Sequence, residues 1–129
     1  MGPTISYEPQ ADGDADPGEV VWGWVPYEDD PSQGKDRPVL VLARQDDALL
    51  TLMLSSKDHV GAGHVDEPRP GQEWFDLGPG AWDPEGRPSE VRLDRVITMD
   101  PSAVRREGAA LDRPRFDAVV AAARQVLGW

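Results

Sequence analysis

Two segments of the chain carry charged side chains with the spacing that phosphate chemistry needs. Arg92 and Asp94 are two positions apart in an alternating segment, so on a strand they share one face and lie about 7 Å apart. A carboxylate there can accept a hydroxyl proton while the guanidinium binds phosphoryl oxygens and serves the leaving group. Arg37 precedes Pro38 at the start of an apolar segment and is a second cation suited to a phosphate. An ordinary surface arginine and a surface ion pair are the alternatives.

Hydroxyl groups and histidines supply further candidates. Ser55 and Ser56 end an apolar segment, where adjacent hydroxyls either donate to a phosphate or mark a turn. His59 and His64 have the chemistry of a general acid and base. Both histidines lie in a Gly-rich segment, however, and we favour Arg92 and Asp94 over them for proton transfer.

The segment that follows has aromatic and cationic side chains. Trp74, Trp82 and Arg87 are able to stack on the bases of a single-stranded nucleic acid, since aromatic rings and guanidinium planes both suit that role. A small core within the loop is the alternative for these residues.

Composition limits the classes of function. The 129 residues carry a formal charge of −11, which argues against a generic nucleic-acid binder. Eight of the 24 acids precede Lys35 and all 13 bases follow Gly34, so a local cationic cleft is compatible with this total. With no cysteine and two histidines, we expect no metal site and no cofactor. No signal peptide and no apolar membrane span is evident, which predicts a cytoplasmic protein with no membrane partner.

Apolar periodicity predicts one small domain. We expect a disordered acidic tail over residues 1–17 and a single domain over 18–129 that contains a long loop at about 57–88. A C-terminal amphipathic helix should begin at an N-cap, Asp112. Strands are expected at 19–25, 38–43, 48–54 and 90–99, with a turn at Asp46-Asp47. This order favours a mainly β fold, a small antiparallel barrel with one helix.

Four blocks, in this order, resemble the PemK/MazF family of toxins from type II toxin–antitoxin systems. The resemblance extends over residues 18–127. The blocks are Gly18-Glu19-Val20-Val21-Trp22, the basic-x-Arg-Pro-apolar segment Lys35–Leu42, the apolar-Ser-Ser segment Leu52–Ser56, and Val91–Asp100, of pattern V-R-x-D-x-x-x-T-x-D.

The resemblance implies an SH3-like barrel with a C-terminal helix, a homodimer and a cognate antitoxin as partner. It also implies a metal-independent endoribonuclease that cleaves single-stranded RNA. In that reaction the 2′-hydroxyl attacks the adjacent phosphate and gives a cyclic phosphate and a 5′-hydroxyl.

The resemblance also assigns roles to residues. Asp94 would be the general base, Arg92 the general acid, Arg37 the cation on the scissile phosphate, and Ser55 the donor that stabilises developing charge. Contacts to the RNA are expected from Lys35, Ser56, Lys57, His59, Trp82 and Arg87. The alternative is a degenerate barrel that binds a protein, or a CcdB-like gyrase poison acting through the C-terminal residues Leu127-Gly128-Trp129.

Overall fold

The computed structural model describes residues 5–9, 15–27, 30–56 and 73–129 as a six-stranded antiparallel sheet with one long helix. The neighbour order in the sheet is β4-β5-β3-β2-β1-β6, and β4 and β6 form its two edges. The elements are β1 (Glu19–Pro26), β2 (Gly34–Gln45), β3 (Ala48–Ser56), β4 (Trp74–Gly78), β5 (Ser89–Met99), the 3₁₀ turn η1 (Pro101–Ala103), β6 (Val104–Ala110) and α1 (Arg113–Leu127). The predicted small antiparallel fold with a C-terminal helix is confirmed, although strand pairing does not close the sheet.

Local sequence signals account for the best predicted elements. Asp46 and Asp47 join β2 to β3 with φ angles of 52° and 65°, the left-handed pair that a two-residue hairpin loop requires. The Asp112 side chain accepts a hydrogen bond from the backbone N–H of Arg115 at 3.1 Å and begins α1. Gly128 ends the helix in the left-handed conformation.

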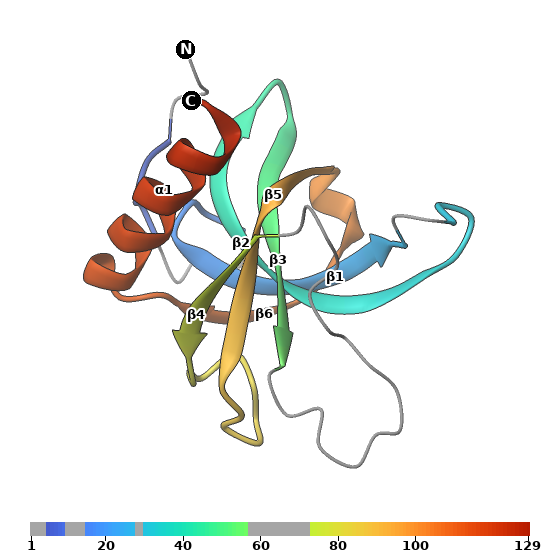
Figure 1. Ribbon diagram of the computed structural model, residues 1–129. Helices are drawn as coiled ribbons and strands as arrows, with labels where there is room; N and C mark the ends of the chain where they lie inside the picture. Colours follow the sequence, from blue (N-terminus) through green and yellow to red (C-terminus); the bar gives the residue numbers. More distant parts are fainter. Residues whose placement is uncertain (1–4, 10–14, 28–29, 57–72) are drawn as a thin grey trace.

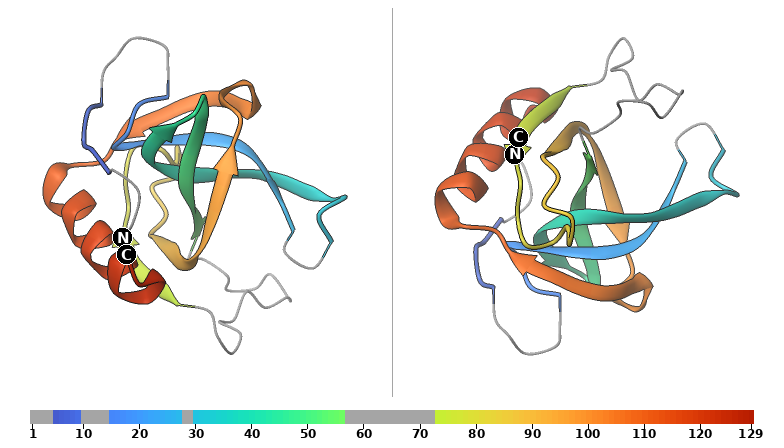
Figure 2. Two further views of the ribbon diagram at one scale, coloured as in Figure 1. Left: turned by 90° about the horizontal axis from the view of Figure 1, so that it is seen from above. Right: turned by 90° about the horizontal axis from the view of Figure 1, so that it is seen from below.

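Apolar side chains cover both faces of the sheet, which explains the uninterrupted apolar segments of β2 and β3. On one face, Leu40 and Leu52 pack under α1, which contributes Phe116 and Val119 to this first cluster. On the other face, Val39, Val41, Leu49, Met53, Ile97 and Met99 form a second cluster. The sheet curls strongly, and α1 lies on the side opposite the projecting end of the β1–β2 hairpin (Figures 1 and 2).

Part of the predicted N-terminal tail packs on the domain, contrary to the expectation of disorder. The ring of Tyr7 lies 5.1 Å from that of Phe116, and its hydroxyl donates to the carbonyl of Leu111 at 2.5 Å. Gly18 has a φ of 98°, and a Cβ there would lie 2.7 Å from the Tyr7 ring, so this contact requires glycine.

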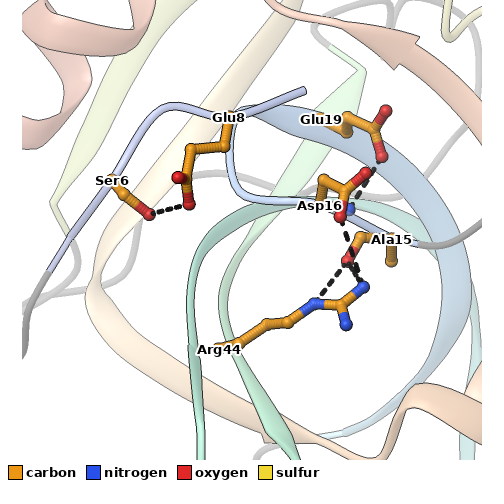
Figure 3. A network of polar contacts seen from close by, with 6 residues as sticks. All are labelled: Ser6, Glu8, Ala15, Asp16, Glu19 and Arg44. Carbon is orange, nitrogen blue, oxygen red and sulfur yellow. Dashed lines mark hydrogen bonds and ion pairs between the residues drawn. The ribbon is translucent and has the colours of Figure 1, made fainter. Parts of the chain in front are cut away.

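Arg44 fastens the second described part of this segment to β2. Its guanidinium donates to the carbonyl of Ala15 at 2.7 and 3.2 Å and pairs with Asp16 at 3.4 Å (Figure 3). Glu19 accepts a hydrogen bond from the backbone N–H of Asp16 at 2.8 Å. Asp16 is thus held to the sheet through Arg44 and Glu19.

Candidate active site

A bulge in β5 carries the two residues singled out for acid–base chemistry. Leu54 is paired with Val91 and Leu52 with Val96, so a two-residue step on β3 faces a five-residue step on β5. Residues 92–95 therefore bulge out of the ladder opposite Met53. Bulges of this kind bend a strand and redirect its side chains, and they occur often beside active sites.

Arg92 and Asp94 form a bidentate ion pair within the bulge. Arg92 Nε lies 3.0 Å from Asp94 Oδ1, and Arg92 Nη2 lies 2.9 Å from Asp94 Oδ2. The side chains are only 7% and 18% exposed, respectively. The bidentate contact and the low exposure of both side chains distinguish this ion pair from the exposed surface ion pairs of the same chain.

The Asp94 carboxylate also has a partner from the polypeptide before β4. The backbone N–H of Glu73 donates to Asp94 Oδ1 at 2.9 Å, and the Glu73 carbonyl accepts from the Leu93 N–H at 2.8 Å. Burial alone would raise the pKa of Asp94, but the hydrogen bonds from Arg92 and Glu73 and the charge of Arg92 outweigh it and leave the pKa below its ordinary value. Asp94 is therefore an ionised acceptor at neutral pH.

Strand register places Arg37 and Ser55 on the same face as this pair. Val91 and Leu93 belong to the cluster under α1, so Arg92 and Asp94 point to the opposite face of β5. Ser55 is 6% exposed and alternates with Met53 of that opposite face.

Arg37 reaches this face from the next strand. Along β2, Arg37 alternates with Val39 and Val41, which belong to the second cluster, and its register partner on β1 is Gly23. The β2–β3 pairing ends at Val39–Met53, and the same register extended by two residues leads to Arg37 and Ser55. Three adjacent strands, β2, β3 and β5, thus direct a cation, a hydroxyl and the ion pair to one face. Lys35, two residues before Arg37, shares this face and is exposed.

Arg95 is a second guanidinium in the bulge, and no role was predicted for it. Its Nη2 donates to the carbonyl of Pro26 at 3.0 Å, and its Nη1 lies 4.0 Å from the sulfur of Met53. A regular strand would have turned Arg95 to the face of Val91 and Leu93. The bulge redirects it to the other face, where it connects β5 to the end of β1.

Trp82 does not join this group of residues. Its side chain is buried in the cluster under α1, its Nε1 donates to Ser89 Oγ at 3.2 Å, and the Arg115 guanidinium lies 5.4 Å from the ring centre. A Cβ at Gly80 would overlap the ring at 2.0 Å, which shows how closely the chain wraps it. Trp82 is therefore core, the alternative that the sequence left open, and is not placed to stack on RNA.

The remaining residues that were expected to contact RNA either have other partners in the structure or lie outside the described residues. Arg87 pairs with Asp83 at 2.9 Å and with Glu85 at 3.2 Å, so it contributes to the turn that contains it. Trp74 packs on the second cluster. The Ser56 side chain, Lys57 and His59 lie outside the described residues, as does His64.

Metal-binding clusters and membrane-spanning helices are both absent from the described residues. No three acidic, histidine or cysteine side chains gather there as they would around a metal ion. None of the helices in these ranges combines the length and the apolar character that crossing a membrane requires.

Comparison with known proteins assigns the family. A solved structure, the Mycobacterium tuberculosis toxin MazF-mt6, is similar with a TM-score of 0.55 at 19% identity, over 86% of this chain and 99% of that one. The likeness supports the fold. No curated protein sequence matches the chain. The model of the family described as PemK-like, MazF-like toxin of type II toxin–antitoxin system matches residues 16–127, that is, nearly the whole chain. The chain is thus a member of the PemK-like, MazF-like family of type II toxin–antitoxin toxins.

Proposed function

We propose that this toxin is an endoribonuclease that cleaves single-stranded RNA without a metal ion. The observation that carries the proposal is the shared face of Arg37, Ser55 and the nearly buried Arg92–Asp94 pair. A carboxylate and two guanidinium groups are the groups that intramolecular attack on a phosphodiester needs.

Asp94 takes the proton from the RNA 2′-hydroxyl. The O2′–P bond then forms and gives a pentavalent, dianionic phosphorane. Arg37 and Arg92 stabilise its negative charge, and the Ser55 hydroxyl donates a hydrogen bond to it. The P–O5′ bond breaks, and Arg92 supplies the proton to the leaving oxygen, because an alkoxide is basic enough to take it. The products are a 2′,3′-cyclic phosphate and a 5′-hydroxyl.

The direct contact between base and acid completes the proton cycle. Arg92 Nη2 and Asp94 Oδ2 are 2.9 Å apart, so the proton gained by the carboxylate can return to the guanidinium. Arg92 also adjusts the base: when its N–H groups turn to the phosphate, Asp94 loses its strongest stabilising partner and becomes more basic. The pair is therefore unreactive until a phosphate arrives.

Family membership implies an antitoxin as partner. We further propose a homodimer that acts in the cytoplasm and an antitoxin that competes with RNA for the face defined above. Because the whole chain carries a charge of −11, apolar contacts should contribute much of the antitoxin affinity. The gyrase-poison alternative finds no support at the C-terminus, since Trp129 packs against the cluster under α1 instead of projecting from the helix.

The test is cleavage of a long single-stranded RNA in the presence of EDTA. Asp94→Asn keeps the size of the side chain and removes the base, and Arg37→Ala removes the phosphate cation. We expect both to lose at least about a hundredfold in rate. Arg105→Ala is the matched control, because Arg105 is an exposed arginine paired with Asp36.

The outcomes separate the proposals. Equal cleavage by the wild type and by both site variants would show that the site is wrongly assigned. No cleavage by the wild type, with the protein folded, would favour a barrel that only binds a protein. Analysis of the product ends for a cyclic phosphate tests the 2′-hydroxyl route separately.

A further inference from the structure

We propose that the backbone amide of Glu73 is a positioning group for Asp94, so that the residue leading into the edge strand β4 fixes the geometry of the base. The inference rests on the proposed function, in which Asp94 accepts the proton of the 2′-hydroxyl. It assigns a task to the backbone of a residue whose side chain is exposed.

The contact between Glu73 and the bulge is reciprocal. The Glu73 N–H donates to Asp94 Oδ1 at 2.9 Å, while the Glu73 carbonyl accepts from the Leu93 N–H at 2.8 Å. The next residue, Trp74, is the register partner of Arg92. Glu73 and the first residue of β4 therefore hold the backbone of the bulge at Leu93 and Arg92, together with one oxygen of the carboxylate.

The two carboxylate oxygens of Asp94 have different hydrogen-bond partners. Oδ1 accepts from both Arg92 Nε and Glu73 N–H, whereas Oδ2 accepts from Arg92 Nη2. If Arg92 turns to a phosphate, Oδ1 keeps the Glu73 hydrogen bond and Oδ2 loses its Arg92 partner. The geometry thus assigns proton acceptance to Oδ2 and prevents the carboxylate from rotating when Arg92 moves.

Other charged groups near Asp94 do not take over this task. Arg92 is the group expected to move, Arg95 from the same bulge is engaged with the Pro26 carbonyl, and β3 presents the uncharged Met53 opposite the bulge. Arg37 approaches from β2 on the same face and is assigned to the phosphate. Only the Glu73 amide, among these described groups, bonds the carboxylate without being required elsewhere in the reaction.

The experiment compares Glu73→Pro with Glu73→Ala. Both remove the same side chain, and only proline removes the N–H. We expect the proline variant to have a kcat about tenfold to a hundredfold below that of the alanine variant, with KM within about threefold, because misplacing a reacting group acts on the chemical step. We also expect the pKa of Asp94 to be higher in the proline variant, since a hydrogen bond to the charged form is lost.

The pKa is measured without RNA, by carbon NMR titration of the Asp94 carboxyl, assigned with Asp94→Asn. Should the proline variant fail to fold, replacement of Glu73 by its α-hydroxy acid removes the N–H without adding a ring. Equal kcat and equal Asp94 pKa in the amide-containing and amide-lacking variants would overturn the inference. A raised Asp94 pKa in the proline variant, together with a wild-type protein that cuts no RNA, would uphold the positioning contact and overturn the proposed function alone.

Discussion

Truncating Asp94 should destabilise the fold far more than truncating an ordinary surface carboxylate. Asp94→Ala removes the acceptor of three hydrogen bonds, two from Arg92 and one from the Glu73 amide. Arg92, whose side chain is 7% exposed, loses its bidentate carboxylate partner. Loss of one partner from a buried pair costs about 3–5 kcal/mol, and because Asp94 itself is 18% exposed we expect the lower end, about 3 kcal/mol.

Urea unfolding at pH 7 measures this change in the free energy of unfolding, and thermal unfolding should show a fall in Tm of about 10 °C for a domain of this size. The control is Asp117→Ala, since Asp117 pairs with Arg113 at 3.6 Å with both side chains more than half exposed. That variant should change stability by less than about 0.5 kcal/mol.

A double-mutant cycle tests the cause. In an Arg92→Met background there is no guanidinium to lose this carboxylate, so Asp94→Ala should cost about 2 kcal/mol less than in the wild type. A loss for Asp94→Ala as small as that for Asp117→Ala, or a coupling energy near zero, would refute the interpretation of Arg92 and Asp94 as a buried, mutually dependent pair. In that case the bulge would owe its conformation to Leu93 and the backbone contacts of Glu73 alone.

Three further predictions concern acidity, the N-terminal segment and the bulge. Burial alone would raise the pKa of Asp83, but hydrogen bonds from Arg87 and Glu85 and the Arg87 charge outweigh it and lower the folded-state pKa. The stability that Asp83 contributes is therefore present above its unfolded pKa of about 4 and is lost as the pH falls through the folded-state pKa. In urea unfolding, Asp83→Asn should accordingly flatten the loss of stability below about pH 4. Tyr7→Phe should lower the free energy of unfolding by about 1 kcal/mol through loss of the bond to Leu111, and an unchanged value would show that the segment adds nothing to stability. Arg95→Met should cost about 1 kcal/mol and reduce RNA cleavage more than Arg105→Ala does, whereas equal cleavage by the two variants would exclude Arg95 from support of the site.

Local patterning in the sequence was sufficient for much of the fold. The strand β5, the Asp46-Asp47 turn and the Asp112 cap each depend on neighbours within a few residues, and each was predicted correctly, although the bulge breaks the alternation of β5 after Asp94. The two-residue spacing of Arg92 and Asp94 was likewise enough to put them on one face, because side-chain direction on a strand has period two.

Contacts between distant segments were not predictable in this way. β6 contains the polar residues Arg105, Arg106 and Glu107 and becomes a strand by pairing with β1, more than 80 positions earlier, so no local apolar pattern marks it. Tyr7 gains its place only when Phe116 and Leu111 come together across the sequence. Trp82 was ambiguous for the same reason, since burial depends on what folds over a ring.

The candidate site also has features that the sequence predicted and features that depend on contacts between distant segments. The sequence determined which side chains carry groups suited to a phosphate and, through strand period and family blocks, predicted that Arg37, Ser55, Arg92 and Asp94 act together. Only the tertiary structure decided that the β5 bulge turns Arg95 toward β1 and that the Glu73 amide reaches Asp94. A bulge arises where two paired strands contain different numbers of residues between the same two pairings. A backbone N–H is present in every residue except proline. Neither feature can therefore be recognised from the residue types.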